Sequence, residues 1–233
     1  MSHYIWFNSN PLLDYLTDNW EQIRDEYIQW ISWHRNQYGT KLKANIISSQ
    51  TQNLPLYEGT FESVSLFLRD SLLIYTEARL MGWENFGKKE GAKYIYREEW
   101  LKQMPTLHKW VVEHFDILGS IQINTCKPGS LLRHHFGNDP NYLRFHLTLE
   151  EAAGCEFNIE NECHTWKNGE LFGFDDAIVY HGTKHTGTQD RTILIIDILK
   201  SEVKQYAKEW SIVDGMTKKD RFPKAIVGWY PKR

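Results

Sequence analysis

Two histidines in the second half of the chain could hold a metal ion. His135 stands between a KPGS turn and Gly137, and His181 stands between the apolar segment AIVY and Gly182. Neutral imidazole binds iron, zinc, copper and nickel, so these side chains indicate a transition metal without selecting one. His134 is a second imidazole beside the first. Because neighbouring strand residues point to opposite faces, one of the two at most can face the metal, and the spacing to the following arginine favours His135.

An arginine ten residues after the second of these histidines could hold an anion near the metal. Arg191 precedes the apolar run TILIIDIL, and its guanidinium is buried if it shares a face with Ile193 and Ile195. A buried cation needs an anionic partner, and the planar fork of arginine suits a carboxylate held through two parallel hydrogen bonds. Asp190 or Asp197 could be that partner in a purely structural arrangement, so this arginine alone leaves both interpretations open.

The segment YLRFHLTL at 142–149 divides into an apolar face and a polar face. Strand alternation sets its Leu and Phe side chains apart from a polar set, Tyr142, Arg144, His146 and Thr148. A polar face is usually solvated, but it can also line a pocket inside a barrel. The alternating segment IQINT has a polar face as well, formed by Gln122 and Asn124. Two such strands near the histidines favour the pocket.

The elements that must position these side chains are mostly strands. From residue 118 onward, short apolar or alternating runs are separated by Gly, Asn and Pro turns, as is typical of a β-sandwich or jelly roll. Before that, apolar residues recur at helical spacing over 10–36, where Asn10 can cap the helix and Pro11 can begin it. Strands are predicted over 56–76. A second helical stretch is predicted over 97–115, with a fresh helix beginning at Pro105.

Length and composition limit the class of protein. We expect a single domain of 233 residues, divided into N-terminal helices and supporting strands (1–117), a β core (118–200) and a C-terminal helix with a basic tail (201–233). The 27 basic and 30 acidic residues do not form the basic pattern of a nucleic-acid-binding protein. No secretory signal and no apolar run long enough to span a membrane are visible, so we expect a cytoplasmic protein without a membrane partner.

The three cysteines have no zinc-binding spacing. Cys126, Cys155 and Cys163 give an odd count and no CxxC pair. Reduced thiols are the expected state, although Cys155 and Cys163 could face each other across a hairpin.

The segment from Lys127 to Leu199 resembles the aspartyl/asparaginyl β-hydroxylase family of iron- and 2-oxoglutarate-dependent oxygenases. A Pro-Gly turn precedes an HxG motif, RxHL and TWxxGE follow, and FDD precedes the second histidine and its trailing arginine. The residues are Pro128, Gly129, His135, Phe136, Gly137, Arg144, His146, Leu147, Thr165, Trp166, Gly169, Glu170, Phe174, Asp175, Asp176, His181 and Arg191. The resemblance implies a mainly β fold with flanking helices and a double-stranded β-helix (cupin-like jelly-roll) core.

The resemblance also implies a role for each matching position. His135 and His181 would bind iron(II). Arg191 would bind the distal carboxylate of 2-oxoglutarate, with Asn124 beside it, and two further residues would contact the carboxylate nearest the iron, namely Arg144 and His146. Trp166 and the two aspartates of FDD are interpreted as structural. Gly137 stands where many related sites carry an acidic ligand, so water or Asp139 would fill that position.

The activity implied is hydroxylation of a C–H bond, coupled to decarboxylation of 2-oxoglutarate to succinate with O₂ as oxidant. Members of the family act on Asp or Asn in proteins, on lipid A or on free amino acids. Tyr142 stands where the animal enzymes have a second arginine, and this favours a small amino-acid-like or peptide substrate here. The alternative from a different class is a metal- and carboxylate-binding jelly-roll module that oxidises nothing.

Overall fold

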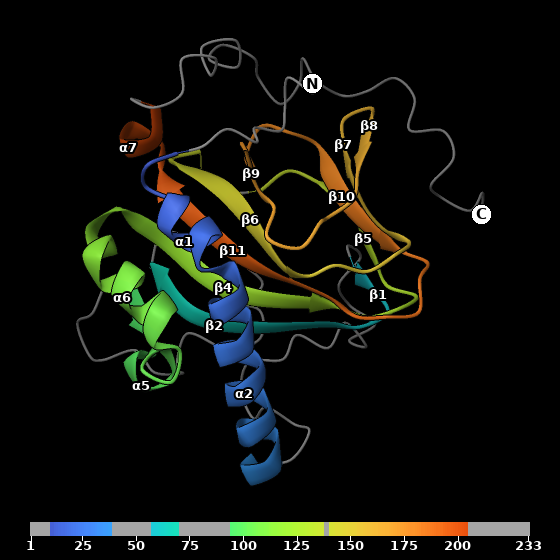
Figure 1. The fold of residues 1–233 in the computed structure, drawn as a ribbon. Coiled ribbons are helices and arrows are strands. Elements are labelled where there is room, and N and C mark those ends of the chain that lie inside the picture. Colours follow the sequence, from blue (N-terminus) through green and yellow to red (C-terminus); the bar gives the residue numbers. More distant parts are fainter. Residues whose placement is uncertain (1–9, 39–56, 70–93, 138–139, 205–233) are drawn as a thin grey trace.

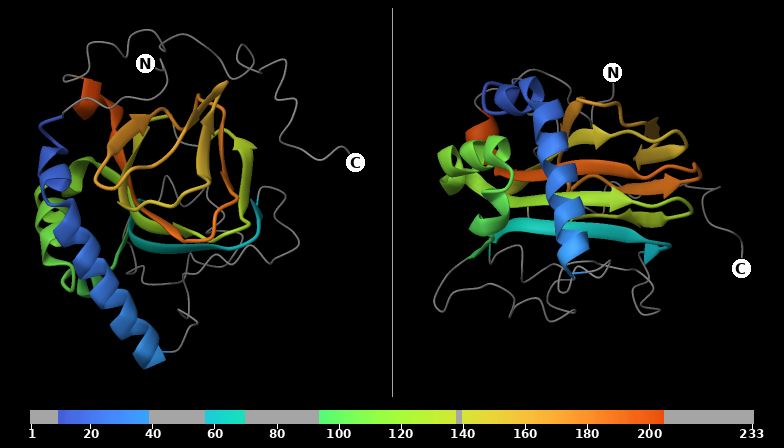
Figure 2. Two further views of the ribbon diagram at one scale, coloured as in Figure 1. Left: turned by 45° about the vertical axis from the view of Figure 1, so that its right-hand side comes forward. Right: turned by 60° about the horizontal axis from the view of Figure 1, so that its bottom comes forward.

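Two antiparallel sheets enclose a common interior in the computed structural model, which describes residues 10–38, 57–69, 94–137 and 140–204 (Figures 1 and 2). The larger sheet has the strand order β3-β2-β4-β11-β6-β9 and the smaller one the order β1-β5-β10-β7-β8. The predicted class, mainly β with a jelly-roll core, is confirmed. The strands are β1 (Tyr57–Glu58), β2 (Phe61–Arg69), β3 (Tyr94–Tyr96), β4 (Leu118–Cys126), β5 (Leu131–His135), β6 (Tyr142–Glu150), β7 (Cys155–Ile159), β8 (Glu162–His164), β9 (Leu171–Phe174), β10 (His181–His185) and β11 (Arg191–Leu199).

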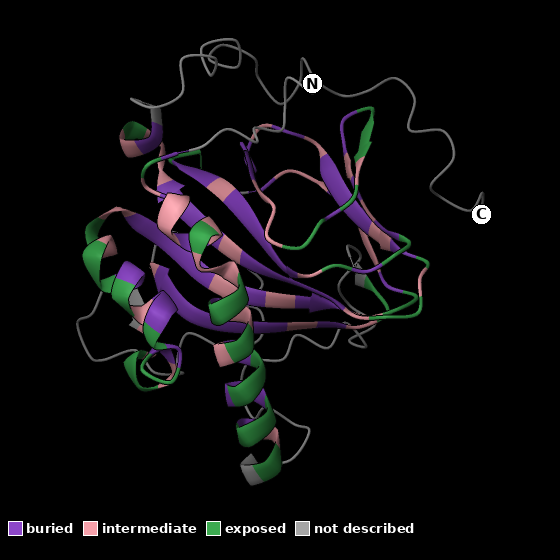
Figure 3. Cartoon of the chain, in the orientation of Figure 1, coloured by how far each residue is buried: buried purple, intermediate pink, exposed green. Residues whose placement is uncertain are grey.

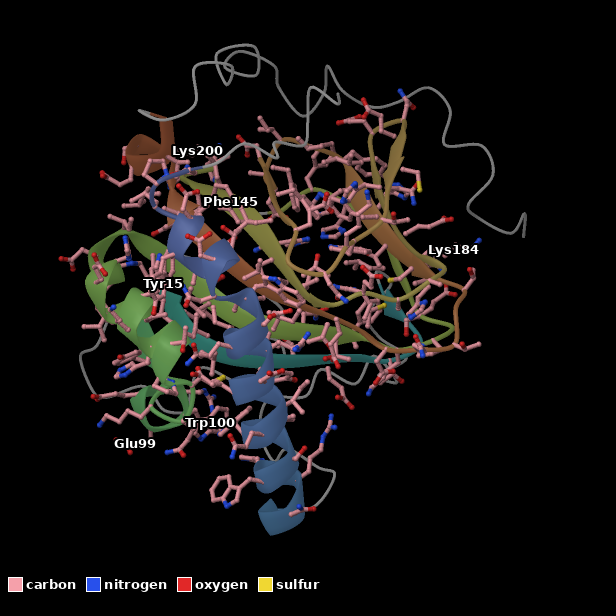
Figure 4. The ribbon with its side chains drawn as sticks, viewed as in Figure 1. Tyr15, Glu99, Trp100, Phe145, Lys184 and Lys200 are labelled. Atoms are coloured by element: carbon pink, nitrogen blue, oxygen red, sulfur yellow. The ribbon has the colours of Figure 1, made fainter. Side chains whose placement is uncertain are left out.

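Helices cover the outer face of the larger sheet. They are α1 (Asp14–Asp18), α2 (Trp20–Tyr38), α5 (Glu98–Leu101), α6 (Pro105–Glu113), the 3₁₀ turn η2 (Phe115–Ile117) and α7 (Lys200–Lys204). The lower half of α2 turns an exposed side toward solvent, whereas the strands behind it are mostly buried (Figure 3). The apolar stripe of α2 packs on the outward side chains of β6, including Phe145, which Figure 4 labels. This outer layer is therefore an ordinary helix-on-sheet core, and it supports the strands that carry the polar side chains.

The inner face of the larger sheet is the unusual one. On β6, Leu143, Phe145, Leu147 and Leu149 belong to the core under the helices, so the alternate residues of this strand point into the barrel. The same alternation on β11 turns Leu194 and Ile196 outward and Arg191, Ile193, Ile195 and Asp197 inward. The polar face of 142–149 therefore lines a closed interior, and the solvated-face alternative is wrong.

The predicted elements differ from the observed ones mainly at their ends. The helix over 10–36 is divided at Asn19, whose side-chain amide donates to the carbonyl of Tyr15. Asn10 accepts a hydrogen bond from the backbone N–H of Leu12, and the chain turns once before α1 begins. Pro105 begins α6 as predicted. Of the strand prediction over 56–76, the part up to Arg69 is observed, and the remainder lies outside the described residues, as does the basic tail from residue 205.

No helix of the described part of the chain is both long and apolar enough to cross a membrane.

Two adjacent valines of α6 test the outer core. Val111 is fully buried against the sheet, whereas Val112 is 56% exposed. Val111→Ala should lower the free energy of unfolding by about 2 kcal/mol, because it removes two buried methyl groups and leaves a cavity. Val112→Ala should change it by less than about 0.5 kcal/mol. Urea unfolding of both variants measures the difference, and equal losses would show that α6 does not dock as described.

Candidate active site

The two candidate metal-binding histidines lie side by side on neighbouring strands. His181 on β10 is the direct cross-strand partner of His135 on β5, and their ring centroids are 4.4 Å apart. His134 packs instead against Tyr180, with a centroid distance of 5.2 Å. The structure thus brings together the pair His135 and His181 that the sequence predicted.

Both rings are oriented by the backbone. Nδ1 of His135 lies 2.9 Å from the carbonyl oxygen of Arg133, and Nδ1 of His181 lies 2.8 Å from that of Val179. Each Nδ1 therefore carries the proton, which leaves Nε2 as the coordinating atom, the usual arrangement of a metal-binding histidine. Burial, together with the charge of His181, lowers the pKa of His135 to about 3. Its imidazole is neutral at physiological pH, as metal binding requires.

An aspartate from the FDD segment lies at this pair. Asp176 Oδ1 is 3.1 Å from Nε2 of His181. Because Nδ1 already holds the proton of a neutral ring, a second proton or a metal ion at Nε2 would satisfy both the ring and the carboxylate. Burial raises the pKa of Asp176, but Arg144 and the hydrogen bond to His181 outweigh that effect and hold the pKa well below its usual range.

Gly137 makes room for that carboxylate. A Cβ atom at residue 137 would overlap the Asp176 side chain, and the Gly137 N–H donates to the Asp176 carbonyl at 2.6 Å. The space next to the HxG motif is thus occupied by an acid from a different part of the chain. Both FDD aspartates were interpreted as structural. Asp176 in addition contacts the candidate metal-binding pair, whereas Asp175 forms an ion pair with Lys200 at 2.5 Å and accepts the turn N–H groups of residues 178 and 179.

The donor set fits a metal bound by two histidines. No group of three His, Cys, Asp or Glu side chains within the described ranges forms a complete metal site. Two neutral imidazoles with free Nε2 atoms suit iron, zinc or copper, and water or a chelating ligand can supply the remaining positions. Asp139, the other acid considered at sequence level, lies outside the described residues.

Arg144 is held by two carboxylates. Its Nε and Nη2 donate to the two oxygens of Asp197, each at 2.9 Å, and its Nη1 donates to Asp176 at 2.9 Å. Asp197 also accepts a 2.6 Å hydrogen bond from the Ser120 hydroxyl. Two carboxylates of the protein thus already engage the guanidinium, and the expected contact between Arg144 and a bound carboxylate stays a prediction.

Arg191, unlike Arg144, is not bound by either of the two candidate aspartates. It is 2% exposed, and its guanidinium stacks on the Trp166 ring at 4.3 Å. Asp190 forms an ion pair with Lys127 at 2.5 Å, and Asp197 binds Arg144, so neither candidate internal anion reaches it. Among the described residues, no hydrogen-bond partner is found for Arg191 Nε or Nη1. The structural alternative for this arginine is therefore excluded for both aspartates.

Other buried polar atoms around Arg191 also lack a hydrogen-bond partner among the described residues. Within the described part of the chain, no partner is found for Nδ1 of His146, Oγ1 of Thr148 or Nε1 of Trp166. His146 and Trp166 stack at 6.3 Å, and Thr148 lies two residues further along the inner face of β6. Burial lowers the pKa of His146 well below its usual value, and the charges of Arg144 and Arg191 lower it further. Each of these groups can donate a hydrogen bond, and unpaired buried donors are costly, so they indicate an acceptor-rich ligand.

The other polar residues considered from the sequence lie near the site or pair elsewhere. Asn124 is half-buried on the inner face of β4, paired with Ile193 and thus diagonal to Arg191. His185 Nε2 lies 2.6 Å from the carbonyl oxygen of Gln189, and His164 Nε2 lies 3.1 Å from a carboxylate oxygen of Glu170. Cys163 lies opposite Asn158 and not opposite Cys155, so the hairpin pairing of those two cysteines is wrong.

Sequence reasoning placed Thr148 on the polar face of its strand but gave it no role, and it named Asp197 only as a possible partner of Arg191. Strand parity also puts Asp197 on the inward face of β11, where it binds Arg144. Asp176 gave no such signal, because it lies in a turn and its contact with Gly137 is long-range.

Comparisons with known proteins show the family of the chain. The aspartyl/asparaginyl beta-hydroxylase family model matches residues 17–201. Aspartate beta-hydroxylase domain-containing protein 2 of Homo sapiens is 28% identical over 86 residues, which are 36% of this chain and 23% of the human protein. The Xenopus tropicalis protein of the same name has the same identity and coverage. The matched segment thus spans less than a quarter of these relatives.

Solved structures that resemble the chain include a predicted oxalate decarboxylase from Thermotoga maritima, with 18% identity and a TM-score of 0.32 over 38% of this chain and 73% of that one. The Cnp3 cupin domain of Schizosaccharomyces pombe has 9% identity and a TM-score of 0.30 over 37% of this chain and 57% of that one. The family model, in contrast, spans both sheets, the histidine pair and Arg191. This chain belongs to the aspartyl/asparaginyl β-hydroxylase family.

Proposed function

We propose that the protein is an Fe(II)- and 2-oxoglutarate-dependent hydroxylase that acts on an amino-acid-like substrate, free or within a peptide. His135 and His181 would hold the iron through Nε2. Bound iron would activate O₂ and supply the oxidising power for C–H hydroxylation, while 2-oxoglutarate is converted to succinate and CO₂. The remaining requirements fall on this chain's own residues, which must bind and orient the co-substrate and exclude water.

The cluster of unpaired donors around Arg191 carries the proposal. Arg191 would bind the distal carboxylate of 2-oxoglutarate through its unpaired guanidinium N–H groups, with Thr148 and the Trp166 indole N–H as further donors. His146 lies between this cluster and the histidine pair, because its ring stacks on Trp166 at 6.3 Å and also contacts Phe174, which in turn contacts His181. It would therefore donate to the end of the co-substrate nearest the metal. Asn124, on the adjacent strand, would complete the inner wall.

Arg144 would position Asp176 next to the histidine pair and would not itself hold the co-substrate. Its guanidinium links Asp197 to Asp176, and Asp176 contacts His181. The ion pairs keep Asp176 ionised and fix its carboxylate next to Nε2 of His181. From there the Asp176 carboxylate could accept a hydrogen bond from a water molecule beside the metal ion that the two histidines would hold.

The alternative is a metal- and carboxylate-binding module without catalysis. It uses the same histidines and the same Arg191, so binding measurements alone do not separate the two. Release of succinate does, because a module that only binds leaves 2-oxoglutarate intact.

The iron site is tested with His181→Ala. Anaerobic addition of Fe(II) and 2-oxoglutarate to the wild-type protein should give a weak visible charge-transfer band, and admission of O₂ with a pool of amino acids and short peptides should release succinate. Both signals should disappear in His181→Ala, because one of two protein ligands is lost.

His164→Ala is the matched control, since His164 lies on the same small sheet and contacts Glu170 and Phe172. It should retain both signals. Iron bound by the wild-type protein without the band, or without succinate from any substrate, would contradict the hydroxylase and leave the binding module.

The anion site is tested with two substitutions on the inner face of the large sheet. Arg191→Met should weaken 2-oxoglutarate binding roughly 10- to 150-fold, as expected for about 1.5–3 kcal/mol from a charged hydrogen bond. Thr148→Val should weaken it about 2- to 12-fold, because one neutral donor worth about 0.5–1.5 kcal/mol is removed. Isothermal titration of the anaerobic Fe(II) protein measures both.

Thr125→Val supplies the control for the second substitution. The Thr125 hydroxyl on β4 lies 3.1 Å from that of Thr192 on β11. Ile123, two residues earlier on β4, belongs to the core beneath the helices. Thr125 has the parity of that outer face, so its substitution should not change 2-oxoglutarate affinity. If Thr125→Val and Thr148→Val weakened binding equally, the Thr148 assignment would be wrong.

A further inference from the structure

The connection between β9 and β10, residues 175–180, carries the aspartate beside the histidine pair and leads directly into His181. Its first residue, Asp175, is buried, and its Oδ2 lies 2.5 Å from Nζ of Lys200. Lys200 is labelled in Figure 4 and lies where β11 continues into α7. The backbone carbonyl of Asp175 accepts two N–H groups from further along the connection. The residue that Lys200 binds therefore also closes the turn.

The end of β11 holds both aspartates of this connection. Asp197, on the inward face of β11, binds Arg144, and Arg144 donates to Asp176 at 2.9 Å. Three residues after Asp197, Lys200 binds Asp175 directly. Two adjacent carboxylates are thus fixed from one strand end, the first by an ammonium group and the second through a guanidinium.

The ion pair of Lys200 with Asp175 is largely covered by protein. The two side chains are 18% and 8% exposed, whereas those of the pair Lys102–Glu98 at α5 are 45% and 50% exposed. Exposed ion pairs contribute little, but removing one partner of a covered pair leaves a buried charge without compensation. The backbone N–H of Lys200 also donates to the carbonyl oxygen of Asn141 at 2.9 Å, which fixes the position of the lysine itself.

We propose that Lys200 is a positioning residue of the candidate metal site. Through Asp175 it fixes the start of the β9–β10 connection, and this keeps the Asp176 carboxylate 3.1 Å from Nε2 of His181. Residues that hold a metal need such outer contacts to keep their orientation. The inference rests on the part of the proposed function in which His135 and His181 hold a metal ion. It does not depend on the co-substrate or the substrate.

Loss of the Lys200 ammonium group would act on the site through the backbone. The Asp175 carboxylate would lose its cation at a buried position, which favours movement of this side chain toward water. Asp176 would move with it, because the two residues are adjacent. The 2.6 Å hydrogen bond from the Gly137 N–H to the Asp176 carbonyl and the contact with His181 would then both be disturbed.

Titration of the metal-free full chain with Co(II), followed by visible absorption, tests this role. Lys200→Met should weaken Co(II) binding about 3- to 10-fold, somewhat less than the roughly 10- to 100-fold typical of a direct contact to a ligand. Lys200→Arg should bind Co(II) within about twofold of the wild type, because the ion pair can form again. Lys102→Met is the matched control, since it removes a lysine whose ion pair is exposed, and it should also stay within about twofold.

Nitrogen-15 NMR of the histidine rings in the metal-free protein gives a second readout. The ring resonances of His181 should move in Lys200→Met and keep their positions in Lys200→Arg and Lys102→Met. A lysine that only stabilises the fold would make Lys200→Met less resistant to urea without changing its Co(II) affinity or these resonances. That result would overturn the proposal.

Asp175→Asn keeps the proposal testable if Lys200→Met folds poorly, because it leaves no buried carboxylate without a cation. It should weaken Co(II) binding to a similar extent. Adding Lys200→Met to Asp175→Asn should change Co(II) affinity by less than about twofold, since both substitutions break the same contact. Additive losses would overturn the proposal.

His181→Ala separates this inference from the proposed function. Co(II) binding that is lost in His181→Ala but unchanged in Lys200→Met would overturn the role of Lys200 alone. Co(II) binding that survives in His181→Ala would contradict the proposed metal site, and with it the role given to Lys200 there.

Discussion

The interior of this structure depends on one buried guanidinium, that of Arg191, for which the described residues supply no anion. Moving an arginine out of water is expensive, and proteins that do so normally supply a carboxylate. Arg191 has two acidic residues on or next to its own strand, yet one binds Lys127 and the other binds Arg144. The stacked Trp166 ring stabilises the charge in part, but it offers no acceptor for Nε or Nη1. A ligand that brings a carboxylate would meet this need.

The interior of the barrel is organised around that requirement. Arg144 and Arg191 lie on adjacent strands of the same sheet, and both point inward. The first is fully engaged by Asp176 and Asp197, and its network ends at the histidine pair. The second is left unsatisfied, together with nearby donors on His146 and Thr148. One arginine therefore maintains the geometry of the candidate metal site and the other remains available for an anion.

Features set by neighbouring residues in the chain could be predicted from the sequence, whereas contacts between residues far apart in the chain could not. Period-two alternation gave the inward set on β4, β6 and β11, because those strands are long and one face of each is apolar. The histidine pair followed from spacing, and the register of β5 and β10 places the two rings together. The contacts of Asp176 with Gly137 and Arg144 could not be predicted, because these residues are far from it along the chain. The ion pairs of Arg144 were not predicted for a related reason: the carboxylates that bind it come from a turn and from another strand.

The central claim is that one 2-oxoglutarate molecule spans from the His135–His181 pair to Arg191. It is tested most directly by nuclear magnetic relaxation of carbon-13-labelled 2-oxoglutarate, with paramagnetic Mn(II) in place of iron. Relaxation should be strongest at the C1 carboxylate and C2 keto carbons and clearly weaker at C5, and the enhancement should vanish in His181→Ala. Relaxation that is equal along the molecule, strongest at C5, or unchanged in His181→Ala would contradict the claim.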